Sequence, residues 1–218
     1  TSAIDAAINS IPTIFIDMHK NFSPDAIFLN QYNYPLKNLI VKDYGELKYR
    51  PKAITNAVLT NQGDLYSDLD RTRTYSYLSQ LNSFKYPNIE YVENKNDTTL
   101  TANIYLNPRK KYGLGFDFNV SQRNIQKIGL SFSTGVLIRN IFRGAETLEI
   151  SALGAIGASK DGAKSDDQFF DINELGADIK LNIPRLFFPF NTEKIIPKFM
   201  SPTTQLSTGF TSQKNIGL

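Results

Sequence analysis

The chain has 218 residues, of which 41% are hydrophobic and 21% charged, a composition typical of a folded protein and not of a disordered one. Lys and Arg total 24 against 21 Asp and Glu, a net charge of +3 that is too balanced to indicate nucleic-acid binding. There is no Cys, which excludes disulfides, thiolate metal sites and a Cys nucleophile, and there is no run of about 18 apolar residues that would make a membrane-spanning helix. Membrane-spanning β-strands are not excluded, because strands of roughly 9 to 11 residues with alternating apolar and polar side chains barely affect the mean hydropathy.

The first half of the chain mixes strand and helix patterns. Residues 13–18 predict a strand, and residues 21–38, rich in Asn, Pro and aromatic side chains, predict an irregular connection. Pro51 suits the first position of a helix over roughly 51–60, and a second helix is predicted over 68–82.

The second predicted helix has a candidate cap and an apolar face. Asp68 or Asp70 is expected to cap its first turn. Tyr75, Leu78 and Leu81 recur at three-residue spacing and predict its buried side.

Two strands with alternating apolar residues follow, over 89–92 and 99–106, joined by a turn at 95–97. The predicted order is therefore strand, helix, helix, strand, strand, which indicates a small α+β layer of helices on one sheet. The basic triplet 109–111 is expected to end the last of these strands in solvent.

The second half, from Tyr112 onward, is dominated by alternation of apolar and polar residues. Five strands are predicted, at 112–121, 128–136, 147–156, 174–183 and 203–213. One face is apolar, and the other is rich in Gly and Ser with Asp, Asn, Glu and Lys among them. Such a polar face is typical of a wet barrel lumen. A soluble β-sandwich, whose outward face usually carries more Lys, Glu and Thr, is the alternative.

The connections between these strands differ in character. The linker 138–145 is predicted to be an inner turn, and the polar run 159–168 an outer loop. Residues 184–202 are long and contain Pro and aromatic residues, and a short helix or a docked segment is expected there. His19 is expected to be structural or exposed, because it has no partner ligands. Asp166 and Asp167 form an acidic pair in a loop, where solvation is favoured over a weak Ca²⁺ site. No metal-ligand spacing is found, so no metal site is predicted.

Several motifs resemble one known family. Residues 49–108 resemble a polypeptide-transport-associated (POTRA) domain through YRPKAI, NQGDLY, YLSQLNSF and LTANIYLNP. The segment RNIFRGAETLEIS, residues 139–151, is similar to the first inner turn and third strand of the barrel in the outer-membrane barrel-assembly and translocation superfamily. Within it, KYRPK and NIPRLFFPF look most like the TamA-like lipoproteins of Bacteroidetes. The resemblance covers roughly residues 40–218.

The resemblance implies a fold and a division of the chain. Residues 1–108 would form an α+β POTRA domain of order β-α-α-β-β with an N-terminal insertion. Residues 109–218 would form about the first five strands of an antiparallel transmembrane β-barrel. The family's barrel has about sixteen strands, and an open five-stranded sheet would leave edge backbone groups unpaired in lipid. The chain is therefore expected to be part of a larger barrel.

The resemblance also implies a non-enzymatic role without cofactors. The family helps to fold, insert or export proteins at the bacterial outer membrane, with its POTRA domain in the periplasm. Expected partners are unfolded outer-membrane or secreted client proteins, outer-membrane lipid, and a periplasmic or inner-membrane protein bound through the POTRA domain. Two rivals are an exporter of the two-partner-secretion type and a soluble periplasmic β-sandwich that binds or scaffolds.

Two surfaces are candidates for client binding. One is an exposed POTRA strand edge, at whichever of 89–92 or 99–106 lies outermost, which would pair with an extended client. The other is the first barrel strand, weakened by glycine. The alternatives are that the POTRA strand residues pair only within their own sheet and that the glycines only make room in the barrel lumen. The candidate residues are Thr99, Leu100, Ala102, Ile104, Gly113 and Gly115.

The turn motif supplies a third set of candidates, Asn140, Phe142, Gly144 and Glu146. Gly144 is expected to occupy a positive-φ position. Glu146 is expected either to pair with Arg143 or to be solvated.

Overall fold

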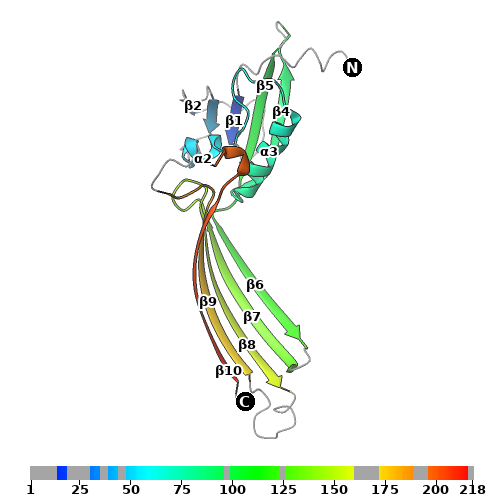
Figure 1. Ribbon diagram of the computed structural model, residues 1–218, viewed down its shortest axis with the longest axis vertical. Coiled ribbons are helices and arrows are strands. Elements are labelled where there is room, and N and C mark those ends of the chain that lie inside the picture. The colour runs from blue at the N-terminus through cyan, green and yellow to red at the C-terminus, as the bar shows by residue number, and fades with distance from the viewer. Residues whose placement is uncertain are drawn as a thin grey trace. The chain divides into compact units, whose positions relative to one another are not determined.

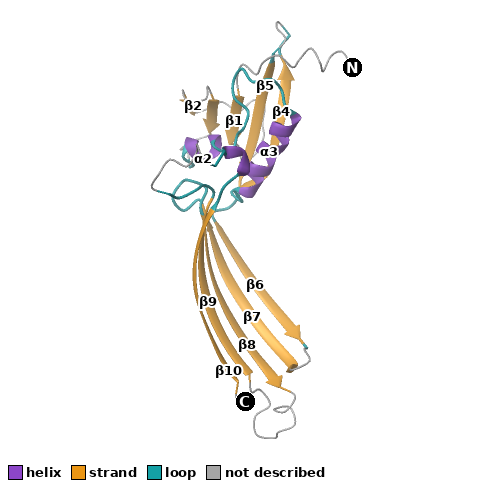
Figure 2. Ribbon diagram, viewed as in Figure 1, coloured by secondary structure: helices purple, strands orange, loops and turns teal. Residues whose placement is uncertain are grey.

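Two five-stranded sheets carry the fold of the computed structural model (Figures 1 and 2). The structure describes residues 14–18, 30–34, 39–43, 48–95, 99–122, 126–159, 172–188 and 196–215. His19, Asp166 and Asp167 lie outside these ranges. The chain divides into two units, each with one sheet. Unit 1 comprises Thr1–Lys110, Arg139–Glu146 and Ile183–Thr204, and unit 2 comprises Lys111–Ile138, Thr147–Asn182 and Gln205–Leu218.

The sheet of unit 1 has the order β2-β3-β1-β5-β4. The central strand β1 runs parallel to both β3 and β5, whereas β2 and β4 are antiparallel to their neighbours. The strands are β1 Ile14–Met18, β2 Asn30–Tyr34, β3 Leu39–Asp43, β4 Phe84–Glu93 and β5 Leu100–Pro108.

The structure adds two strands, β2 and β3, to the predicted order. The expectation of an irregular connection over 21–38 is wrong for residues 30–34, which pair along their length with β3. The Asn-rich composition of this segment gives a weak local strand signal. Pairing with β3 overrides it, because an added strand satisfies backbone donors and acceptors along the sheet edge.

The two helices of unit 1 are α2, Pro51–Thr55, and α3, Asp68–Gln80. Helix α2 is shorter than predicted, because the chain tightens into three-residue turns in which Ala57 N–H donates to the Ile54 carbonyl. The cap of α3 was wrongly predicted. Ser67 Oγ accepts the Asp70 N–H at 3.2 Å, so the two aspartates lie in the first turn, where their charge favours the helix dipole.

The buried side of α3 is only partly as predicted. Leu78 is 0% exposed and Leu81 is buried, but Tyr75 is exposed and Thr74 is buried in its place. Thr74 is tolerated there because its Oγ1 accepts the Leu59 N–H at 3.1 Å. The core of unit 1 comprises Tyr49, Ile54, Ala57, Val58, Leu78, Leu81, Phe84, Ile89, Ala102, Ile104, Leu106 and Ala145.

The sheet of unit 2 has the order β10-β9-β8-β7-β6, so strands that follow one another in the chain are neighbours. Its strands are β6 Tyr112–Ser121, β7 Gln126–Arg139, β8 Thr147–Ser159, β9 Ile172–Ile183 and β10 Thr204–Asn215. The five predicted strands are confirmed, and they form an open sheet. Within the described residues β6 and β10 are its two edges.

Two connections of the second sheet belong to unit 1, a feature absent from the predicted division at residue 108. Residues 139–146 contribute Ala145 to the core of unit 1. The expectation for 184–202 is confirmed on both counts, since η2 (Lys198–Met200) is a short helix and Ser201 Oγ donates to Gln80 Oε1 at 3.3 Å. The described part of the chain has no helix that is long and apolar enough to cross a membrane.

The core of unit 1 generates a first prediction. Leu78→Ala is expected to lower the free energy of unfolding by roughly 2–5 kcal/mol, because it removes a fully buried side chain. Leu69→Ala, on the same helix but at a position 57% exposed, is the matched control and should change it by less than about 0.5 kcal/mol. Urea unfolding of the whole chain in detergent, followed by circular dichroism, measures both. Equal losses would contradict the assignment of this helix face.

Candidate functional site

The segment Arg139–Glu146, here called the anchor turn, has an unusual backbone. Three of its non-glycine residues have positive φ, namely Asn140 at 55°, Arg143 at 65° and Ala145 at 63°. Each such residue costs roughly 1–3 kcal/mol unless its surroundings hold it. The turn is therefore a place to look for strong local interactions.

An ion pair between a buried carboxylate and a partly exposed guanidinium lies at the end of the anchor turn. The Glu146 side chain is 1% exposed, and its Oε1 lies 3.0 Å from Nη2 of Arg185. Its other oxygen, Oε2, accepts the Gly144 N–H at 2.8 Å. Both expectations for Glu146 are wrong, since it neither pairs with Arg143 nor faces solvent. A buried carboxylate needs such a set of partners, because desolvation of an unpaired charge is costly.

Gly144 is required for a different reason from the one predicted. Its φ is not among the positive values of the described residues. Instead, a Cβ at this position would collide with the Glu146 carboxylate and lie 2.7 Å from Arg185 Nη1. The glycine therefore leaves space for the ion pair.

Backbone and amide hydrogen bonds fix the anchor turn to the start of α2. Asn140 Nδ2 donates to the Lys48 carbonyl at 2.8 Å, and Asn140 Oδ1 accepts the Ala145 N–H at 3.1 Å. The Arg50 N–H donates to the Arg143 carbonyl at 2.6 Å. The motif residues 48–50 and 139–146 thus form one hydrogen-bonded group within unit 1.

Arg139, at the start of the anchor turn, holds two further segments. Its Nε donates to the Asn82 carbonyl and its Nη1 to the Lys110 carbonyl, both at 3.1 Å. Of the four predicted motif residues, Asn140, Gly144 and Glu146 make internal contacts. Phe142 instead is 55% exposed.

The segment Ile183–Thr204 also packs within unit 1. Thr204 Oγ1 donates to the Arg185 carbonyl at 3.0 Å and accepts the Phe187 N–H at 2.9 Å. These two bonds join the beginning of the segment to its end. The Arg73 guanidinium lies 5.5 Å from the ring centre of Phe199. Arg185 was missed by sequence reasoning. A single Arg between Pro184 and a run of aromatic residues was the available signal.

Strand β4 is the exposed edge, and β5 is not. Strand β5 pairs with β1 on one side and with β4 on the other. Of the predicted candidates, Ala102 and Ile104 are buried and paired on both sides, so the premise of an open edge is wrong for these two. The pairing with β1 begins at Ala102, so Thr99 and the buried Leu100 lie outside it.

The register of β4 shows which of its backbone groups point outward. The Asn94 N–H donates to the Thr99 carbonyl at 3.0 Å. Hydrogen-bonded pairs alternate with non-hydrogen-bonded pairs along an antiparallel ladder. Glu93, Tyr91 and Ile89 belong to the non-hydrogen-bonded pairs, so their N–H and C=O groups point away from β5.

A bulge limits this edge at its other end. The pairing register shifts between Lys85 and Asn88, Tyr86 has φ 43° and is 86% exposed, and Pro87 has no N–H to donate. The edge available for pairing is thus about six residues long. The Tyr91 ring, on this edge, packs edge-on against the Tyr66 ring, with 4.9 Å between the ring centres. Burial raises the pKa of the Tyr91 hydroxyl.

The other glycine candidates lie on edge strand β6. Gly113 and Gly115 pair with Leu137 and Gly135, within ten consecutive pairs to β7. A Cβ on Gly115 would have no neighbour within 4 Å. The glycines leave the ladder unbroken but remove side-chain packing between Gly115 and Gly135.

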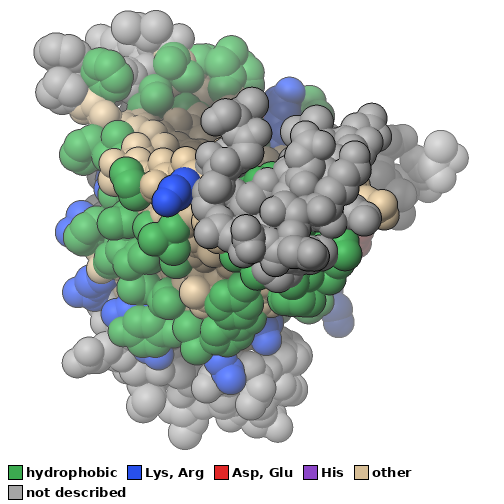
Figure 3. Space-filling model, turned by 90° about the horizontal axis from the view of Figure 1, so that it is seen from below, with side chains coloured by type: hydrophobic (Ala, Val, Ile, Leu, Met, Phe, Trp, Pro, Cys, Tyr) green, Lys and Arg blue, Asp and Glu red, His purple; other side chains and the backbone are tan. Residues whose placement is uncertain are grey.

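The sheet of unit 2 has one face, here called the apolar face, that other described residues do not cover. Figure 3 shows hydrophobic side chains crowding the described surface, with Lys and Arg scattered among them. On β6, Leu114 is 71% exposed, and Phe116 and Phe118 are similarly open. The pairings place the following side chains on this face: Tyr112, Leu114, Phe116, Phe118, Val120, Ile128, Leu130, Phe132, Val136, Leu148, Ile150, Ala152, Ile156, Leu175, Ala177, Ile179, Leu181, Leu206 and Phe210.

Comparison with known proteins gives structural neighbours at low similarity. CdiB from Acinetobacter baumannii is 10% identical with a TM-score of 0.49, over 82% of this chain and 26% of that one. BamA from Haemophilus ducreyi, lacking POTRA domains 1–3, is 12% identical with a TM-score of 0.33, over 84% and 40%. CdiB from Escherichia coli is 9% identical with a TM-score of 0.36, over 97% and 52%.

The chain thus spans between a quarter and about half of the length of these proteins. At TM-scores below 0.5 the similarity establishes neither fold nor function. No family model matches the sequence, and no curated protein matches it.

The ion pair generates a second prediction. Arg185→Ala is expected to lower the free energy of unfolding by roughly 1.5–3 kcal/mol, because it leaves the buried Glu146 carboxylate without its cation. The loss is smaller than for a fully buried pair, since the Arg185 side chain is 39% exposed. Arg71→Ala is the matched control. It breaks the Asp68–Arg71 pair, whose side chains are 72% and 46% exposed, and should cost no more than about 1 kcal/mol.

A double variant separates charge from packing. Adding Glu146→Gln to Arg185→Ala removes the unpaired charge and keeps an acceptor for Gly144, so part of the lost stability should return. Urea unfolding of the whole chain measures all the variants. A double variant no more stable than Arg185→Ala would show that the carboxylate charge is not the cause.

Proposed function

We propose that this chain is part of an outer-membrane protein assembly or translocation factor, in which the sheet of unit 2 forms part of a transmembrane β-barrel. The observation that carries this proposal is the apolar face, which runs across all five antiparallel strands and is not covered by other described residues. Exposure of so many large apolar side chains to water is unfavourable, so a nonpolar environment is required.

The dimensions of the strands support a bilayer as that environment. The strands contain 10, 14, 13, 12 and 12 residues. Tilted strands of about 9 to 11 residues cross the hydrocarbon layer. The two open edges, β6 and β10, would be paired with further strands, because unpaired backbone groups are not tolerated in lipid.

The opposite face of the sheet suits a water-filled interior. It carries glycine, serine and charged side chains, and Ser133 Oγ donates to Asp117 Oδ2 at 3.5 Å across β6 and β7. Gly209 lies against Asp178 of the neighbouring strand, where a side chain would collide with the carboxylate. A soluble sandwich would need a second layer over the apolar face, and the described residues supply none.

For unit 1 we propose a POTRA domain acting in the periplasm. Strand β1 parallel to β5, with β4 antiparallel at the edge and two helices between β1 and β4, supports this assignment. The finer assignment to the TamA-like lipoproteins rests on the motifs KYRPK and NIPRLFFPF, which contain Lys48, Arg50 and Arg185 of the hydrogen-bonded group around the anchor turn.

The proposed partners are extended segments of unfolded outer-membrane or secreted proteins. The outward backbone groups of Ile89, Tyr91 and Glu93 are suited to pairing with such a segment. We propose no catalysis. The described residues contain no group of three or more His, Cys, Asp or Glu that could hold a metal ion.

A third prediction tests the membrane assignment. The full-length natural protein is expected to require detergent for extraction and to migrate differently on a gel before and after boiling, because a closed barrel resists unfolding by detergent alone. A monodisperse protein in plain buffer whose migration does not change on boiling would contradict the barrel and favour the soluble sandwich.

A fourth prediction tests the β4 edge. The probe is a fluorescently labelled synthetic peptide with the sequence of residues 112–121, used as a model outer-membrane strand. Glu93→Pro removes an outward N–H and should weaken binding about two- to tenfold, as expected for loss of about one hydrogen bond. Fluorescence anisotropy with the full-length protein measures the affinity.

Glu93→Ala is the matched control, because it removes the same side chain and keeps the N–H. It should bind the peptide as the unmodified protein does. Equal weakening by both variants would assign the effect to the side chain, and no weakening by either would exclude pairing at this edge.

A further inference from the structure

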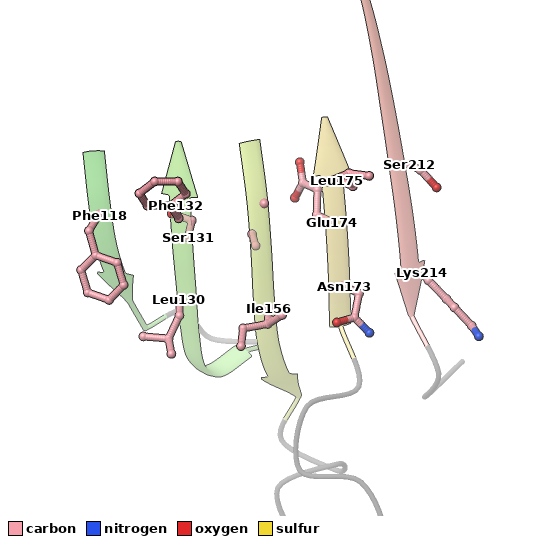
Figure 4. Close-up of a pocket in the computed structure, with 12 residues that line it drawn as sticks. Phe118, Leu130, Ser131, Phe132, Ile156, Asn173, Glu174, Leu175, Ser212 and Lys214 are labelled. Atoms are coloured by element: carbon pink, nitrogen blue, oxygen red, sulfur yellow. The ribbon is translucent and has the colours of Figure 1, made fainter. Parts of the chain in front are cut away.

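The apolar face contains a hollow near one end of the strands. Its volume is about 510 Å³, and it lies on unit 2 only. Figure 4 shows the residues that line it, which come from all five strands of the sheet. Aromatic and aliphatic residues come from β6, β7, β8 and β9, and polar residues from β7, β9 and β10.

Cross-strand pairing explains how the hollow forms. Phe118 pairs with Phe132 and Gly154 pairs with Leu175. A Cβ on Gly135 would lie 3.8 Å from that of Ser151, a register that places Phe132 opposite Gly154. Phe118, Phe132, Gly154 and Leu175 therefore form one row across the sheet. Gly154 is the gap in that row, and a Cβ there would meet nothing within 4 Å.

A second row, one step closer to the strand ends, brings polar groups to the hollow. Gly176 lies against Thr211 and Gly209 against Asp178, a register that places Asn173 opposite Lys214. Both are one residue from the end of their strands, β9 beginning at Ile172 and β10 ending at Asn215.

Lys214 extends away from its strand in Figure 4. Among the described residues, no carboxylate forms an ion pair with it. Glu174 is also among the residues that line the hollow, but strand alternation directs its side chain to the other face of the sheet.

The hollow thus has an apolar floor and, at the level of the strand ends, a polar rim that includes the positive charge of Lys214. In a transmembrane sheet, strand ends lie at the depth of lipid head groups and the positions further along the strand lie among acyl chains. We propose that the hollow binds a membrane lipid with a net anionic phosphate head group, its phosphate at Lys214 and Asn173 and one acyl chain over Gly154. This inference rests on the proposed membrane function of the sheet.

Electron spin resonance of spin-labelled lipids tests the proposal. The full-length protein is reconstituted in phosphatidylcholine vesicles that contain either spin-labelled phosphatidic acid or spin-labelled phosphatidylcholine. The unmodified protein should immobilise the anionic lipid preferentially. Lys214→Glu should reduce that preference about fivefold or more, since one Lys near anionic lipid contributes about 1 kcal/mol. Lys214→Arg should keep the preference, because it preserves the positive charge.

The floor of the hollow is tested separately. Gly154→Leu fills the gap in the row and should reduce the bound fraction of both lipids. Thr208→Leu also adds bulk on the same face, two rows deeper on β10, and should change neither fraction. Inorganic phosphate should not displace the spin-labelled lipid, because the acyl chain contributes to binding.

The outcomes separate this inference from the membrane proposal. A protein that migrates differently on boiling, yet shows no lipid preference or no effect of Gly154→Leu, would overturn the lipid site alone. Displacement by inorganic phosphate would also overturn it. A protein that does not insert into vesicles would instead overturn the proposed function. Migration of each variant before and after boiling shows whether it has assembled.

Discussion

A single layer of strands with one apolar face is stable only where something nonpolar covers that face, and this constraint governs the second half of the molecule. Alternation of side chains across extended strands sends Leu114, Phe116 and their neighbours to one side and glycine, serine and charged residues to the other. A bilayer outside and water inside would satisfy both faces at once, and further strands would satisfy the edges β6 and β10.

In unit 1 the corresponding constraint is the buried Glu146 carboxylate. One of its oxygens forms an ion pair with Arg185, and the other accepts the Gly144 N–H. A side chain at position 144 would occupy the space of this ion pair. The most specific motif of the sequence is thereby explained as an anchor that brings residues 139–146 and 183–204 into unit 1. Conformational cost at three positive-φ residues is offset by these contacts.

The two edges of the unit 1 sheet differ in the backbone groups that they present for strand pairing. Strands β2 and β3 extend the sheet beyond β1, so β1 and β5 are both interior. On the opposite side, β4 presents outward backbone groups over a short stretch that ends at the bulge around Tyr86. A short and interrupted edge limits uncontrolled pairing while leaving room for one extended segment.

The sequence by itself determined the strands of unit 2, both helices of unit 1 and the strands β1, β4 and β5, because periodicity and Pro51 act locally. It also identified the segment 139–146, although not the role of its residues. Only the tertiary structure decided that Arg185 is the partner of Glu146, that β5 is interior and that β2 and β3 join the sheet. Those features depend on residues tens of positions apart, and side-chain periodicity carries no information about which distant segment completes a sheet or neutralises a buried charge.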